Sequence, residues 1–173
     1  MRRILSTCVL SLFLPWTAAA NSPLLSFRGG IGVSPVSSGV GTATQATDVN
    51  RNVVREVQPS GFPWTIRDLR ADVGPTGMID VRGQGLLVAG GDSIGTNANQ
   101  KVFATLVCGA AAPFTTHSTP DTGVTLERDG DFRITAALTP APPETCAKPV
   151  LLIRNLAGAW FAAGIPVAPR GAN

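Results

Sequence analysis

Apolar residues alternate with polar ones along most of the chain, and short turns rich in Gly, Pro and Asp separate the alternating runs. The clearest run is 101–108, in which Val102, Ala104, Leu106 and Cys108 share one phase. A period of two is the spacing of side chains on one face of a β-strand. No window keeps the spacing of three and four residues that an amphipathic helix needs. The pattern therefore predicts an all-β fold.

Turn segments separate three pairs of apolar runs, and each pair predicts a β-hairpin. The pairs are 69–73 with 79–83, 124–126 with 132–138, and 150–154 with 160–165. Further strands are expected at 27–33 and 52–57. About eight short strands without helical crossovers favour a single antiparallel β-sandwich over 21–173, immunoglobulin-like or of a related Greek-key type. A small closed β-barrel is the alternative.

The two C-terminal runs, 150–154 and 160–165, are apolar almost without interruption. A strand with one solvated face normally shows polar residues at every second position. These strands are therefore expected either to be buried on both faces or to contact a protein partner, which includes a second copy of the chain.

Residues 1–20 have the features of an export signal. Arg2 and Arg3 form a basic start, an apolar run follows, and 18–20 supplies small residues before a predicted cleavage ahead of Asn21. The apolar run is shorter than the about 20 residues that span a bilayer, so no membrane span is expected. We expect the signal to be removed and the chain to be secreted, periplasmic or bound at the cell surface.

Removal of the signal also removes Cys8 and leaves Cys108 and Cys146. In an oxidising compartment, two such cysteines most simply form one disulfide. Cys146 follows a Pro-rich connection at 139–143, so the bridge would tie this connection to the strand that ends at Cys108. Zinc needs four ligands, and His117 is the only histidine, so no metal is expected at the cysteines.

Charged residues make up 14% of the chain, and the formal net charge is +3. Without Arg2 and Arg3, 12 basic and 11 acidic residues remain, so the exported chain is almost neutral. It has no cluster of Lys and Arg with which to displace counterions from a polyanion, so we expect no nucleic-acid partner. Gly83-Gln84-Gly85 has Val88 where a dinucleotide-binding motif has its third Gly, so no cofactor is expected.

Residues 91–95, Gly-Asp-Ser-Ile-Gly, satisfy the pattern G-x-S-x-G. They resemble the serine blocks of the Gly-Asp-Ser lipase-esterases and of the trypsin-like proteases, and the resemblance implies Ser93 as a nucleophile with His117 as its base. No Asp or Glu lies between Ser93 and His117, as the α/β-hydrolase order demands, and a trypsin-like protease has its His before its Ser. Thr115 stands where the esterases have Asp. We expect a polar surface loop here, and an exposed loop around His117.

Two groups of oxygen-bearing side chains could attract Ca²⁺. They are Asp92, Asn97 and Asn99, and Glu127, Asp129 and Asp131. Neither group has the spacing of an EF-hand loop, and a hairpin turn accounts for the Asp-Gly-Asp string. We therefore expect turns rather than a metal site.

Phe62-Pro63-Trp64 is the remaining candidate site. Exposed aromatic rings can stack on sugars or anchor a protein partner, so Phe62 and Trp64 form a candidate binding patch. Ile66, two positions later, favours instead an inward Trp64 that closes the end of the core. The leading hypothesis from the sequence is an exported, non-catalytic binding or assembly module. The alternatives are a small secreted serine hydrolase centred on Ser93 and a barrel that binds an apolar small molecule.

Overall fold

The structure is a computed structural model that describes residues 22–38 and 49–168. These residues form thirteen strands and no helix. The strands are β1 (Leu25–Gly32), β2 (Val36–Ser38), β3 (Val49–Arg51), β4 (Trp64–Thr65), β5 (Asp68–Val73), β6 (Met78–Gln84), β7 (Leu87–Val88), β8 (Lys101–Cys108), β9 (Thr115–Ser118), β10 (Val124–Thr125), β11 (Phe132–Ala137), β12 (Val150–Asn155) and β13 (Trp160–Pro166). The predicted all-β fold is confirmed.

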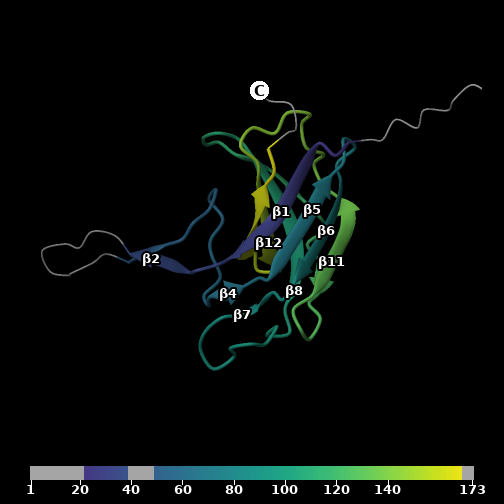
Figure 1. The fold of residues 1–173 in the computed structure, drawn as a ribbon. Helices are drawn as coiled ribbons and strands as arrows, with labels where there is room; N and C mark the ends of the chain where they lie inside the picture. The colour runs from purple at the N-terminus through teal and green to yellow at the C-terminus, as the bar shows by residue number, and fades with distance from the viewer. Residues whose placement is uncertain (1–21, 39–48, 169–173) are drawn as a thin grey trace, which may run out of the picture.

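Nine of these strands form one antiparallel sheet in the order β10-β8-β12-β13-β1-β5-β6-β11, with β9 paired to β8. The sheet curves back on itself, so that β1, β5, β6 and β11 lie in front of β8 and β12 in Figure 1. Its two end strands, β10 and β11, approach each other without pairing, and the sheet is therefore nearly closed. This arrangement fits a β-sandwich or a small barrel. The count exceeds eight because β2, β3, β4 and β7 have only two or three residues, too few to show an alternation, and because β9 replaces the loop expected around His117.

The predicted hairpin of β5 and β6 forms, and its register places the apolar residues of the two strands opposite each other. Ala71 lies opposite Val81 and Val73 opposite Ile79, and all four side chains are buried. The intervening residues, including Asp72 and Asp80, point outward. Because a slip of one residue would bury these charges, the apolar pattern specifies the register. The predicted hairpin of β12 and β13 is also confirmed.

The hairpin predicted for 124–126 and 132–138 is wrong in its pairing. The turn forms, since Glu127 N donates to Asp131 O over 2.8 Å and Gly130 N donates to Glu127 O over 2.9 Å. After the turn, however, β11 pairs with β6, while β10 pairs with β8. The turn residues indicate only that the chain reverses direction. They do not show that β8 and β6, which are distant in sequence, pair with the two strands that flank the turn.

Strands β8 and β12 are buried on both faces. In β8, Leu106 and Thr105 point to opposite faces, and both are fully buried. Arg154 of β12 covers part of the outer face, because its guanidinium lies 5.2 Å from the centre of the Phe103 ring and donates to Thr105 Oγ1 over 3.3 Å. The apolar C-terminal run of Leu151, Leu152 and Ile153 is likewise fully buried by the chain itself.

Residues 52–60 run beside β13 and contribute to this burial. Trp160 N donates to Gln58 O, and Ser60 N donates to Trp160 O, each over 3.0 Å. The strand predicted at 52–57 is wrong: Val54 and Val57 face each other across a tight turn, in which Arg55 and Glu56 have positive φ. Val57 then packs in the buried core.

The predicted export signal, 1–20, lies outside the described residues. Among the residues that the structure describes, no helix is long and apolar enough to cross a membrane.

Candidate functional site

A pocket of about 440 Å³ lies beside the small sheet of β4 and β7, which is labelled near the lower end of Figure 1. Its walls come from three distant segments: the loop before β4, the loop after β7, and the facing ends of β12 and β13. Trp64 of β4 pairs with Val88 of β7, and this pairing fixes the positions from which the two loops leave. The pocket is therefore a product of long-range packing.

Two stacked aromatic rings form the buried side of the pocket. The ring centroids of Trp64 and Phe161 lie 4.0 Å apart, and the planes differ by 12°. Only 5% of Trp64 and 2% of Phe161 are exposed. Trp64 Nε1 donates to Ser60 Oγ over 3.1 Å, so the polar edge of the buried indole has a partner. This side of the pocket is apolar and held in place.

Phe62 also lines the pocket, but the residue is 64% exposed. It neighbours Gly91 of the opposite loop, where a Cβ would come within 4.0 Å of Phe62 Cδ1. Gly91 has a φ of +79°, which a glycine adopts without strain, and the chain turns there to present Asp92 and Ser93. Phe62 thus offers an exposed aromatic ring at the pocket.

Polar groups from the remaining walls converge on the same space. Asn155 Oδ1 accepts a hydrogen bond from Ala159 N over 2.9 Å, and Gln100 Nε2 donates to Ala98 O over 3.3 Å. Asn155, Gln100 and Asp92 all line the pocket. A mainly apolar cavity with a few oriented polar groups is the usual form of a small-molecule site.

Ser93 lies in a surface turn that borders this pocket. Ile94 N donates to Gly91 O and Thr96 N donates to Ser93 O, each over 3.1 Å, so the segment is a pair of tight turns between strands. A nucleophile elbow instead needs a strand followed by a helix. The loop form accounts for the residue types of this segment without a catalytic role.

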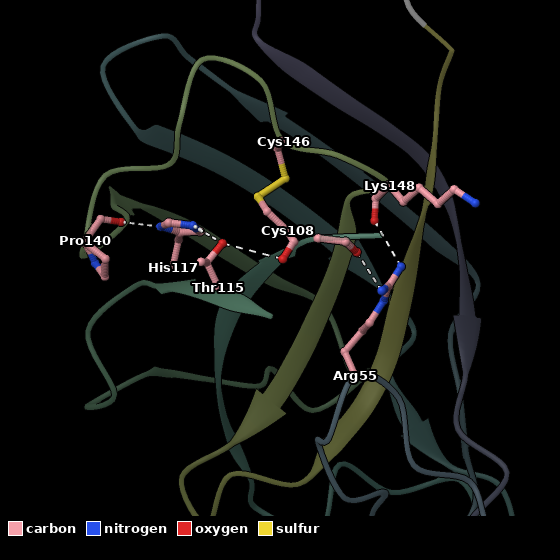
Figure 2. The surroundings of a disulfide bond; sticks show 8 residues. Arg55, Cys108, Thr115, His117, Pro140, Cys146 and Lys148 are labelled. Atoms are coloured by element: carbon pink, nitrogen blue, oxygen red, sulfur yellow. Dashed lines mark hydrogen bonds between the residues drawn. A yellow bond between two sulfur atoms is a disulfide. The ribbon is translucent and has the colours of Figure 1, made fainter. Parts of the chain in front are cut away.

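The prediction that His117 is an exposed loop residue is wrong. His117 lies on β9 opposite Leu106 of β8 and is 4% exposed. Figure 2 shows its ring between Pro140 and Thr115, with Nδ1 2.9 Å from Pro140 O and Nε2 3.3 Å from Thr115 Oγ1. Both ring nitrogens thus have partners other than Ser93. The structure does not bring Ser93 and His117 together.

The predicted disulfide between Cys108 and Cys146 is confirmed, with 5.0 Å between the two Cα atoms. It joins the end of β8 to the connection that leads into β12 (Figure 2). Close by, Arg55 Nη1 donates to Gly109 O over 2.6 Å and its guanidinium lies 4.5 Å from the centre of the Phe114 ring. The bridge and Arg55 both secure the backbone that follows β8.

Of the side chains considered for Ca²⁺, those of Asn97, Asp129 and Asp131 form hydrogen bonds to backbone groups of the surrounding loops. Asn97 Nδ2 donates to Leu126 O and Glu127 O, and Asn97 Oδ1 accepts from Asn99 N. Asp131 Oδ1 accepts from Gly85 N over 2.9 Å. Within 22–38 and 49–168, no cluster of three or more His, Cys, Asp or Glu residues is placed to hold a metal ion.

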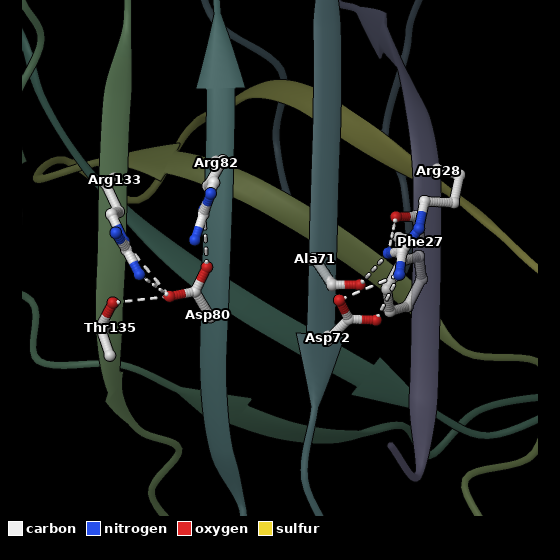
Figure 3. A network of polar contacts seen from close by, with 8 residues as sticks. All are labelled: Phe27, Arg28, Ala71, Asp72, Asp80, Arg82, Arg133 and Thr135. Atoms are coloured by element: carbon white, nitrogen blue, oxygen red, sulfur yellow. Dashed lines mark hydrogen bonds and ion pairs between the residues drawn. The ribbon is translucent and has the colours of Figure 1, made fainter. Parts of the chain in front are cut away.

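A second polar surface covers the outer face of β1, β5, β6 and β11 (Figure 3). Cross-strand partners in one row of this face are Arg28, Arg70, Arg82 and Arg133. Like charges directly opposite each other are destabilising. Here each arginine has a carboxylate oxygen within 3.2 Å, contributed by Asp68, Asp72 or Asp80. The positive row is therefore balanced by its neighbours.

Asp80 connects two of these arginines. Its Oδ2 accepts from Arg133 Nη2 over 2.7 Å and from Thr135 Oγ1 over 3.0 Å, and its Oδ1 accepts from Arg82 Nε over 3.2 Å. Partial burial by itself would raise the pKa of the Asp80 carboxyl, but these hydrogen bonds and the charge of Arg133 outweigh it. The pKa of Asp80 is consequently below its usual value.

The sequence singled out Phe62, Trp64, Asp92 and Ser93, which line the pocket, but assigned no role to Gln100, Asn155 or Phe161. Gln100 and Asn155 stand in polar segments typical of turns, and Phe161 stands in an apolar run typical of a core strand. No local signal distinguishes them, because they meet only when the loop after β7 reaches the ends of β12 and β13.

No protein-family model, curated protein or solved structure matches the chain. The structure itself therefore defines the class: an all-β antiparallel domain with one disulfide, a nearly closed sheet and a pocket of mixed aromatic and polar character beside β4 and β7.

Proposed function

We propose that this protein is an exported, non-catalytic binding module whose ligand occupies the pocket beside β4 and β7. The observation that carries the proposal is Phe62, a large aromatic ring 64% exposed at a pocket into which Asp92, Gln100 and Asn155 also project polar groups. Rigid aromatic side chains bind with little loss of conformational freedom, so they are frequent anchors of ligands. Ser93 lies at the same pocket without His117 beside it, which favours binding over hydrolysis.

Export is supported by the predicted signal at 1–20 and by the disulfide, which is typical of oxidising compartments. The immunoglobulin-like or related Greek-key type of the sandwich stays a prediction. Intact-mass analysis of the protein from the extracellular or periplasmic fraction tests the export proposal. We expect a chain that begins at Asn21 and carries one disulfide, and a chain that retains residues 1–20 in that fraction would contradict the cleavage.

A ligand screen tests the binding proposal. The oxidised protein is mixed with a defined set of small sugars, amines, carboxylates and aromatic compounds, and binding is followed by ligand-observed NMR. We expect at least one compound to bind, and its binding to be weakened by Phe62→Ala. Binders that are unaffected by Phe62→Ala would contradict the assignment of the pocket. Labelling of the wild type by a fluorophosphonate, with none in Ser93→Ala, would instead support the hydrolase alternative.

A further inference from the structure

We propose that the pocket binds one sugar ring of an uncharged glycan, with the ring stacked on Phe62 and its hydroxyls held by Asp92, Gln100, Asn155 and Ser60. This inference rests on the proposed binding function and names the class of its ligand. It follows from three properties of the pocket: an exposed aromatic face, a balanced set of hydrogen-bonding groups, and the charge of the walls.

The aromatic face is the first property. Phe62 is 64% exposed, while Trp64 and Phe161, which line the same pocket, are buried and stacked on each other. The face of an aromatic ring carries partial negative charge. The C–H groups on one side of a pyranose ring are flat, apolar and weakly positive, so they complement such a face. The pocket volume of about 440 Å³ falls within the usual range for small ligands, roughly 300–1,000 Å³.

The hydrogen-bonding groups are the second property. Ser60 Oγ accepts from both Phe62 N and Trp64 Nε1, so its own proton is available to donate. Asn155 Oδ1 accepts from Ala159 N, which leaves the Nδ2 group as a donor. Gln100 Nε2 donates to Ala98 O, which leaves Oε1 as an acceptor, and Asp92 contributes a carboxylate.

The walls thus present two donors and two acceptors around one aromatic face. A sugar hydroxyl donates one hydrogen bond and accepts others, so a row of hydroxyls can satisfy both kinds of group. An organic cation would use the carboxylate and the aromatic face but would leave the donors of Ser60 and Asn155 without partners. Unpaired donors at a desolvated site cost binding energy, which favours the hydroxylated ligand.

The charge of the walls is the third property. Asp92 is the single charged residue among those that line the pocket, and none of them is Lys, Arg or His. A phosphate, sulfate or uronic acid group would meet a carboxylate there without a compensating cation. The site therefore selects uncharged sugars against acidic ones.

The test is a titration with short oligosaccharides of stated composition, followed by the indole N–H signals of the ¹⁵N-labelled protein. The panel consists of disaccharides and trisaccharides of glucose, mannose, galactose, xylose and N-acetylglucosamine. Trp64 and Trp160 are the two tryptophans after the predicted signal. Trp64 Nε1 bonds to Ser60 in the pocket, whereas Trp160 Nε1 bonds to Asn52 O elsewhere. We expect a sugar to shift the Trp64 signal and to leave that of Trp160 in place.

Matched variants make the test specific. Phe62→Ala removes an exposed ring and is expected to weaken binding about tenfold, and Asp92→Asn, which loses a charged acceptor, is expected to do the same. Ile94→Ala is the control, because Ile94 is also 64% exposed and lies on the loop after β7 but does not line the pocket. The Ile94→Ala variant should bind the sugar with the affinity of the wild type.

Three outcomes contradict the proposal in different ways. If no sugar of the panel shifts Trp64, but phenethylamine binds in a manner that depends on Phe62, the sugar inference is wrong and the binding function stands. If neither sugars nor the other compounds of the screen bind at Phe62, both are wrong. A glucuronic acid oligomer that binds more tightly than the uncharged sugars would also contradict the inferred selectivity.

Discussion

Asp80 shows how one residue stabilises the charged outer face. It accepts hydrogen bonds from Arg82, Arg133 and Thr135, which come from its own strand and from the neighbouring strand β11. Arg82 and Arg133 are direct cross-strand partners, so they would repel each other without it. The carboxylate of Asp80 therefore has a stabilising role only while it is ionised.

We predict that Asp80→Asn lowers stability at neutral pH by about 0.5–1 kcal/mol, the range for a partly exposed ion pair. The pKa of Asp80 is lowered in the folded state, so its contribution is complete above the unfolded value, near 4, and is lost as the pH falls through the folded value. Urea unfolding of both proteins at about pH 7 and about pH 2 measures this. The difference should shrink in acid, and a difference independent of pH would contradict the role. Asp68→Asn, which removes a single ion pair with Arg70, should have a smaller effect.

At the scale of elements, the close approach of β1 to β4 determines where the aromatic side of the pocket lies. A Cβ at Gly32 would come 2.0 Å from Trp64 O and 2.8 Å from Thr65 Cα, so only glycine lets the two backbones meet. Two hydrogen bonds flank this contact, from Trp64 N to Val33 O over 3.0 Å and from Val33 N to Phe161 O over 2.8 Å. Gly32 thereby positions both stacked rings.

We predict that Gly32→Ala lowers the free energy of unfolding by about 1–3 kcal/mol, because the added methyl must push backbone atoms apart. The midpoint of guanidinium unfolding, followed by tryptophan fluorescence, measures the change. Ligand binding should weaken in the same variant, since Trp64 moves with its strand. Gly61→Ala is the control for stability: nothing lies within 4 Å of its added Cβ, so its midpoint should equal that of the wild type.

For the whole molecule, the disulfide links two parts of a nearly closed sheet that are distant in sequence. Cys108 and Cys146 are 38 residues apart, and β9, β10 and β11 lie between them. Bridging two such positions restricts the unfolded chain more than the folded one. The cross-link is therefore expected to contribute to global stability rather than to the geometry of the pocket, which none of these three strands lines.

We predict that the double variant Cys108→Ala, Cys146→Ala loses about 4 kcal/mol of stability, the chain-entropy value for a loop of this length. Unfolding by guanidinium, with and without a reducing agent, measures the loss. The wild type should become less stable when reduced, and the double variant should not respond to the reductant. Equal midpoints for the two oxidised proteins would show that the bridge adds nothing to stability.

Patterns among neighbouring residues are enough to predict several of the strands. Period-two alternation predicted β5, β6, β8 and β11, and the turn segment between 73 and 79 predicted the β5–β6 hairpin. Two cysteines left after the predicted signal were enough to predict the bridge. These features depend on neighbouring residues or on elimination, and each could be read without knowing how distant segments meet.

Long-range packing sets the strands with which β10 and β11 pair, the turn of 52–57 back on itself, and the burial of His117 against β8. It also decided the pocket, since Phe62, Gln100 and Asn155 come from segments up to 93 residues apart in a chain without internal repeats. The physical reason is the same in each case. Strand pairing and packing depend on contacts between segments that are distant in sequence. A local pattern specifies which face of a strand is buried but not which strand lies beside it.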